Sequence, residues 1–243
     1  MDIILIVFIA VTAVMVSASV WDVRSREVSD AHWMAIGVMG MAVALMSDDL
    51  LAGAVTAAGY LMFMLYMFVE RIKGTLALLV ISAGMAMLLM AALESEEVYP
   101  MVTLVMTMIF LLMYATGAMK GGADVKALVV LSFVFPAYPE FGSLVWEPVY
   151  PQGYIFNPMF SILLIALVIS VVYAIIVNHH RSGGKRIASY VTTKADAESS
   201  FVWVLEKMDD ETVRVTPMIP FLVPMTVGLL ITVILGCPLF ALI

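Results

Sequence analysis

The sequence predicts an all-α integral membrane protein, a polytopic helical bundle of about eight transmembrane helices. Two observations lead to this fold class. Of the 243 residues, 63% are hydrophobic and the mean hydropathy is +1.07, whereas a soluble domain is about 45–50% apolar. The apolar residues also gather in long runs that are bounded by charged residues. Such runs are typical of helices that face lipid as well as each other.

The first apolar run, residues 3–20, has no basic start and no small-residue cleavage site, so we expect a retained membrane span and not a signal peptide. A span needs about 20 mostly apolar residues. Two of the later runs, 33–46 and 125–136, are short, and it stays open whether they cross the membrane completely or form half-buried segments. The later runs, in order, are 33–46, 50–69, 74–93, 99–119, 125–136, 158–177 and 217–239.

Charge sorts between alternate connections of this chain. One set of connections holds every Lys and Arg of the sequence, namely Arg24, Arg26, Arg71, Lys73, Lys120, Lys126, Arg181, Lys185, Arg186, Lys194, Lys207 and Arg214. In the opposite set, with the N-terminus, all charged residues are acidic, namely Asp2, Asp48, Asp49, Glu94, Glu96, Glu97, Glu140 and Glu147. Since cytoplasmic loops carry the basic excess, we expect the first set in the cytoplasm and both termini outside. A merger of two neighbouring spans into re-entrant segments would preserve this sorting.

Three regions follow from the pattern. Residues 1–177 form a transmembrane helical region, 178–216 a cytoplasmic loop or small appendage, and 217–243 a C-terminal transmembrane helix. The appendage is too short for an independent hydrophobic core. The single cysteine, Cys237, and the three histidines, His32, His179 and His180, do not make a metal set, so we expect no metal and no cofactor. For this acidic chain we expect the lipid bilayer, and no nucleic acid, as a partner.

Two aspartates interrupt the apolar sequence at the ends of spans, at junctions that are expected to face the same side of the membrane. Asp22 ends the first span and Asp124 begins the sixth. Two carboxylates that share a site can activate one water, because one accepts the proton of the water while the other, protonated, donates to a carbonyl. Gly121 and Gly122 precede Asp124, and glycine permits an unusual turn and a close approach of substrate.

A structural role for each aspartate is the alternative. An Asp at a helix N-terminus is usually a cap or a partner of the helix dipole, which fits Asp124. Asp22, followed by Arg24 and Arg26, also fits an ordinary interfacial charge cluster, and the basic residues, Lys126 among them, fit membrane anchors.

The residues around both aspartates resemble a known family. Residues 121–124, Gly-Gly-Ala-Asp, are similar to the motif of the GxGD membrane aspartyl proteases. More narrowly, the chain resembles the archaeal preflagellin (archaellin) and type IV prepilin peptidases. Residues 22–28, Asp-Val-Arg-Ser-Arg-Glu-Val, match their first motif, and residues 121–126 match the second, with Ala123 where glycine is common. The aspartates are farther apart in sequence than in compact members, and 50–93 fits an inserted helix pair.

The resemblance implies a GxGD protease-like bundle and a cofactor-free endopeptidase. Such enzymes remove the short basic leader of archaellin or type IV pilin-like precursors at the cytoplasmic face. Asp22 and Asp124 would be catalytic. Around them, Gly121, Gly122, Ala123, Lys126, Arg24 and Arg26 would support the site, and Glu27, Asp30 and Glu70 are candidates for steering a basic leader.

Two other functions stay open. A presenilin-like or signal-peptide-peptidase-like protease shares the GxGD motif, but it is expected to have a Tyr-Asp pair and a late Pro-Ala-Leu motif, which this chain lacks. A small ion-coupled transporter would place its carboxylates near the middle of the spans, often in matched halves, and neither feature is found here.

Overall fold

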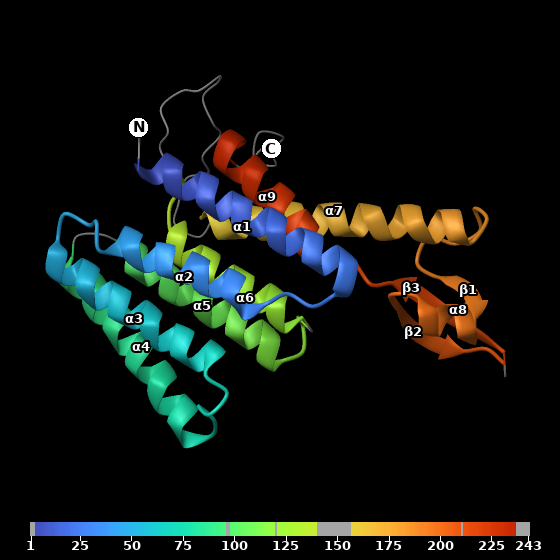
Figure 1. The fold of residues 1–243 in the computed structure, drawn as a ribbon, viewed down its shortest axis with the longest axis horizontal. Helices are drawn as coiled ribbons and strands as arrows, with labels where there is room; N and C mark the ends of the chain where they lie inside the picture. The colour runs from blue at the N-terminus through green and yellow to red at the C-terminus, as the bar shows by residue number, and fades with distance from the viewer. Residues whose placement is uncertain (1–2, 96–97, 120, 140–156, 210, 237–243) are drawn as a thin grey trace.

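A computed structural model describes the whole chain except residues 1–2, 96–97, 120, 140–156, 210 and 237–243. Each of the eight apolar runs forms a helix, and the region before the last helix adds three strands and a short helix (Figure 1). The elements are α1 (Ile3–Ser25), α2 (Asp30–Ala44), α3 (Leu50–Phe68), α4 (Thr75–Glu94), α5 (Tyr99–Ala115), α6 (Gly122–Val134), α7 (Pro158–Arg181), β1 (Tyr190–Thr193), α8 (Lys194–Ser199), β2 (Val202–Lys207), β3 (Thr212–Pro217) and α9 (Leu222–Leu235).

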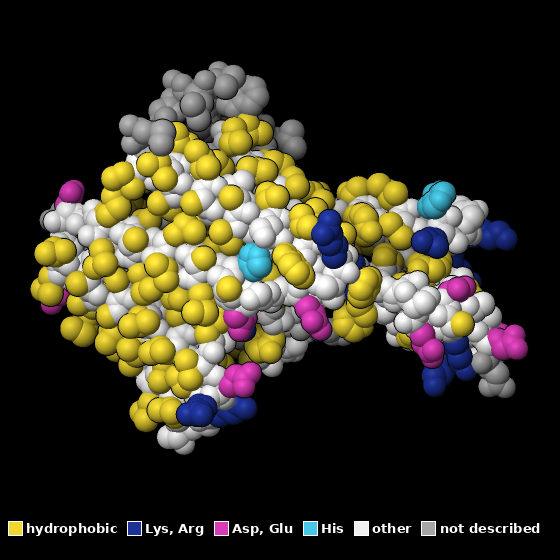
Figure 2. All heavy atoms as spheres, in the orientation of Figure 1, with side chains coloured by type: hydrophobic (Ala, Val, Ile, Leu, Met, Phe, Trp, Pro, Cys, Tyr) yellow, Lys and Arg dark blue, Asp and Glu magenta, His cyan; other side chains and the backbone are white. Residues whose placement is uncertain are grey.

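Four helices among the described residues are long and apolar enough to cross a membrane, namely α1, α3, α4 and α7. Two more, α5 and α9, are apolar but shorter, with 17 and 14 residues. The sequence therefore located the helices well, and four of them meet the length of a complete span. In Figure 2, hydrophobic side chains cover most of the helical part on the face shown, as expected for a surface in contact with lipid.

Helix α6 lies at the centre of the bundle. Residues 127–134 are all buried, and the helix packs against α2 and α5. Helices α3 and α4 extend this group, whereas α1 and α7 both pack on α9 (Figure 1). Successive helices of the bundle run in opposite directions, so the connections after α1, α3, α5 and α7 lie toward the right in Figure 1, the side of the sheet, although the α3–α4 connection is far from the sheet.

Small and hydroxyl-bearing residues let the helices approach closely. A Cβ on Gly228 of α9 would lie 2.8 Å from the carbonyl oxygen of Ile162 in α7. A buried chain of hydroxyl groups joins α3, α5 and α6: Tyr60 shares a hydrogen bond with Thr103, which donates to the Ser132 carbonyl at 3.2 Å. Both devices are typical of helix association in lipid, where apolar burial gives no driving force between helices.

The expectation of an all-α protein is wrong in one region. Residues 190–217 form a three-stranded antiparallel sheet with the order β1-β3-β2, where a loop or small appendage was expected over 178–216 and the last helix from 217. Helix α8 packs on β1 and β3, and the apolar side chains of Tyr190, Ala197, Val213 and Val215 form a small core. Alternate apolar and polar residues in β3 explain the sheet, because one face of that strand is buried.

Several boundaries also move. Helix α1 continues through Asp22 to Ser25, and α7 continues to Arg181, beyond the expected ends at 20 and 177. The last helix begins at Leu222 and not at 217, because residue 217 closes β3. Apolar composition predicts where lipid contact ends, but a helix continues for as long as its backbone hydrogen bonds are favourable.

Candidate active site

Asp22 lies in the last turn of α1, and its side chain is only 14% exposed. Oδ2 accepts a hydrogen bond of 3.3 Å from the backbone N–H of Leu222, the first residue of α9. Helix N-termini favour negative charge, so α9 offsets part of the cost of burying this carboxylate. Ser19, one turn earlier, donates to the Leu222 carbonyl at 3.0 Å and secures α1 against α9.

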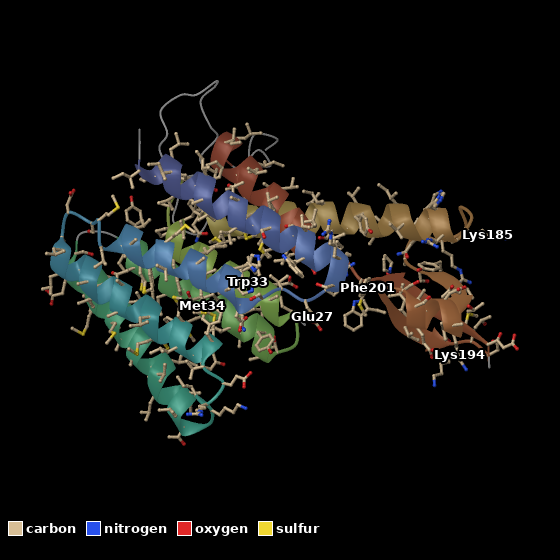
Figure 3. All side chains as sticks on the ribbon, in the orientation of Figure 1. Glu27, Trp33, Met34, Lys185, Lys194 and Phe201 are labelled. Atoms are coloured by element: carbon tan, nitrogen blue, oxygen red, sulfur yellow. The ribbon has the colours of Figure 1, made fainter. Side chains whose placement is uncertain are left out.

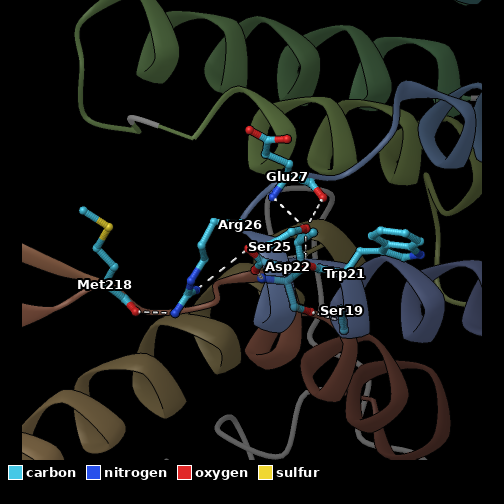
Figure 4. Close-up of polar contacts among 8 residues, drawn as sticks. Ser19, Trp21, Asp22, Ser25, Arg26, Glu27 and Met218 are labelled. Atoms are coloured by element: carbon cyan, nitrogen blue, oxygen red, sulfur yellow. Dashed lines mark hydrogen bonds and ion pairs between the residues drawn. The ribbon is translucent and has the colours of Figure 1, made fainter. Parts of the chain in front are cut away.

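Arg26 ends α1 in a conformation that is unusual for a side-chain-bearing residue. Its φ of 58° lies in the left-handed region, which costs about 1–2 kcal/mol without glycine. Its N–H donates to the Asp22 carbonyl at 3.1 Å, and Nη1 lies 3.8 Å from Asp22 Oδ1. Nη2 donates to the Met218 carbonyl at 2.8 Å (Figure 4). The guanidinium carbon lies 5.1 Å from the centre of the Phe201 ring.

Asp124 lies in the first turn of α6, ahead of the apolar segment 125–136, and is partly buried. Gly121, and not Asp124, is the N-cap residue of this helix. Burial raises the pKa of Asp124 to about 7, the negative charge of Asp22 raises it further within that shift, and Arg26 opposes both. The fold therefore brings Asp22 and Asp124, from two separate helices, within electrostatic reach of each other and of one arginine.

Gly121 has a specific steric role beside Asp124. A Cβ at position 121 would overlap the carboxylate of Asp124, whereas a Cβ at Gly122 would have only the Tyr114 hydroxyl near it, at 3.9 Å. Neither glycine has a positive φ. Neither position therefore adopts the unusual turn that the glycines were expected to permit. Gly121 instead leaves room for the aspartate.

Lys126 and Asp30 pair with each other. Lys126 Nζ lies 2.6 Å from Asp30 Oδ1, so the pair joins α6 to the first turn of α2, and the ammonium also lies 5.1 Å from the centre of the Phe68 ring. Ala123 packs against the main core. Asp30 is thus part of a link between two helices, which leaves less of its charge for steering a substrate.

The other expected site residues lie at the surface. Arg24, Glu27 and Glu70 are exposed, and the Glu27 carboxylate points away from Asp22 in Figure 4. Arg24 therefore does not join the contacts that Arg26 makes. Six residues of the charge pattern lie outside the described residues, namely Asp2, Glu96, Glu97, Lys120, Glu140 and Glu147.

Three residues of the site were not found from the sequence. Leu222 contacts Asp22 through its backbone, and Phe201 and Met218 contact Arg26. The stretch 215–220, Val-Thr-Pro-Met-Ile-Pro, runs from the end of β3 toward α9. Its two prolines bracket Met218, and they are the one signal that could have indicated a fixed backbone at this position.

The described residues contain no group of three or more His, Cys, Asp or Glu side chains that could hold a metal ion. No family model matches this chain, and no curated protein or solved structure matches it either.

Proposed function

We propose that the protein is a membrane aspartyl endopeptidase that removes the short basic leader from archaellin or type IV pilin-like precursors. One observation carries the proposal: Asp22 at the end of α1 and Asp124 at the start of α6 lie in one partly buried site, where the charge of Asp22 raises the pKa of Asp124. Their motifs supply the family resemblance. A shared, partly desolvated pair of carboxylates is the arrangement that water activation requires.

The two carboxylates take different roles in this proposal. Asp124, whose pKa is raised to about 7, holds the proton and donates it to the oxygen of the scissile carbonyl. Asp22 stays ionised, with the Leu222 N–H and Arg26 beside it, and accepts the proton of the attacking water. The water oxygen adds to the carbonyl carbon, and collapse of the tetrahedral intermediate breaks the C–N bond. The reaction needs no cofactor.

The orientation in the membrane is part of the same proposal. Eight crossings with both termini outside would put every basic connection, and both aspartates, at the cytoplasmic face. The alternating directions of the helices support this arrangement. A leader removed at that face would meet Glu27 and Glu70, two exposed carboxylates that attract basic residues over several ångströms.

The test is a cleavage assay in membranes with a panel of leader-bearing subunits from the same genome. Each product is mapped by mass spectrometry. Wild-type protein is expected to cut one or more precursors directly before the hydrophobic helix, and activity is expected to survive chelators. The Asp48→Asn variant is a matched control for Asp22→Asn and Asp124→Asn, because Asp48 is exposed in an acidic connection. Failure to cut any precursor, or loss of activity on chelation, would reject the proposal.

A further inference from the structure

The three-stranded sheet meets the aspartate site at Arg26. Phe201 directly precedes β2 and Met218 directly follows β3, so both lie at the same end of the β2–β3 pair. The Met218 N–H donates to the Phe201 carbonyl at 3.0 Å, which fixes the two residues to each other. Arg26 contacts both, through the Met218 carbonyl and the Phe201 ring. Figure 3 shows Phe201 on the side of the sheet that faces the end of α1.

The same side chain reaches the aspartates. Arg26 Nη1 lies 3.8 Å from Asp22 Oδ1, and the guanidinium charge acts on Asp124. The left-handed backbone at residue 26 turns the chain so that this side chain leaves α1 toward the sheet (Figure 4). A guanidinium has a planar set of donors, so a shift of the carbonyl it binds must reorient the whole group.

We propose that Arg26 is a positioning residue that transmits the position of the three-stranded sheet to the aspartate pair. This inference rests on the proposed peptidase function for its effect on catalysis, but the link between sheet and aspartates is independent of it. With the sheet in place, the Phe201 ring and the Met218 carbonyl hold the guanidinium beside Asp22. When the sheet moves away, the charge leaves the pair, and the protons distribute differently between the two carboxylates.

Among the described residues, few charged groups lie around this site. Asp22 lies in α1 and Arg26 directly follows this helix, whereas Asp124 and Lys126 lie in α6. The ammonium of Lys126 is paired with Asp30 of α2, and the exposed Glu27 points away from the site. Since Arg26 lowers the pKa of Asp124, loss or loosening of Arg26 must raise it.

The experiment compares Phe201→Ala, Arg26→Gln and Arg26→Lys with Leu205→Ala, which removes another exposed apolar side chain of the same sheet. Phe201 is 49% exposed, so Phe201→Ala is expected to fold. For Phe201→Ala we expect kcat to fall about tenfold with KM unchanged, and the alkaline limb of the pH profile to move up. Arg26→Gln is expected to move that limb farther, by about one pH unit. Arg26→Lys should fall between wild type and Arg26→Gln, and Leu205→Ala should match wild type.

An increase of KM alone in Phe201→Ala would mean that the ring contacts substrate, and it would overturn the inference, as would variants that all behave like Leu205→Ala. A second readout needs no substrate. The drop in Tm between pH 5 and pH 8 should be larger in Arg26→Gln and in Phe201→Ala than in wild type, and it should be smallest in Asp124→Asn. If no precursor is ever cut, the proposed function fails. The Tm comparison alone then decides whether Arg26 links the sheet to the aspartate pair.

Discussion

Asp124 combines partial burial, a neighbouring like charge and an opposing arginine, and this combination sets how its protonation affects the protein. In the unfolded chain an aspartate has its ordinary pKa of 3.8, whereas the folded environment raises the pKa of Asp124 to about 7. The folded state therefore binds a proton that the unfolded state releases between these two values. The stability that comes from this proton is complete below about pH 4 and is lost as the pH rises through 7.

Asp124→Asn removes the cost of the buried charge. We expect the variant to match wild type in Tm at pH 4 and to exceed it by about 5 °C at pH 8, although the proposed dyad predicts a large loss of cleavage. Thermal unfolding in detergent across this range measures the difference. The Asp48→Asn variant, at an exposed position, should show no pH-dependent gain. A constant difference at every pH would mean that the pKa of Asp124 is not raised.

Gly121 and Gly122 offer a matched pair of substitutions next to the same aspartate. A Cβ at position 121 would overlap the Asp124 carboxylate, whereas position 122 is nearly open. Gly121→Ala must displace that carboxylate, so we expect cleavage to slow about 100-fold, with Tm little changed. Gly122→Ala lies in a helix, where alanine is favoured, and it should retain activity and gain slightly in stability. Equal activities of the two variants would argue against the steric role of Gly121.

At the scale of the elements, the helices were predictable and their contacts were not. Eight apolar runs became eight helices because apolar length and flanking charge act locally along the chain. The sheet was missed since its strands have four to six residues each, and β2 is exposed along nearly its whole length. Such short segments carry little periodic signal, and only the pairing of β1 and β2 with β3 makes them strands.

The same limit applies to the site. Asp22 and Asp124 were predictable, because a carboxylate in an apolar context and a motif around it are visible in the sequence. The Leu222 N–H and the Met218 carbonyl were not, since every residue has these groups and only the tertiary structure aims them. Arg24 and Arg26 also look alike in sequence. The structure separates them, because residue 26 has the left-handed backbone and the contacts to the sheet.

The contact between α7 and α9 gives a prediction at this scale. Gly228 faces the Ile162 backbone, so a side chain there must separate the two helices. We expect Gly228→Leu to destabilise the protein by about 1–3 kcal/mol. The cleavage rate should fall as well, because α9 also supplies the Leu222 N–H that donates to Asp22. Val227→Leu adds volume at a neighbouring position that is 38% exposed. Thermal unfolding should show little change in that control, and equal losses in both variants would contradict the close contact.

For the whole molecule, the distribution of charge predicts an orientation. The variants Lys73→Cys and Asp48→Cys, each in a Cys237→Ser background, place one cysteine in a basic and one in an acidic connection. With a membrane-impermeant maleimide on intact cells, we expect labelling at 48 and none at 73 until the membrane is opened. The reverse pattern would put the basic connections outside. Labelling of both positions from one side would contradict the alternation of the spans.

The central claim is that Asp22 and Asp124 act as one unit, and the most direct test is the cleavage rate of the two single variants and the double variant. A dyad predicts that Asp22→Asn, Asp124→Asn and the double variant each lose about 100- to 10,000-fold in rate, by nearly the same factor, because either loss disables the pair. Rates that multiply independently, or a single variant with full activity, would contradict the dyad.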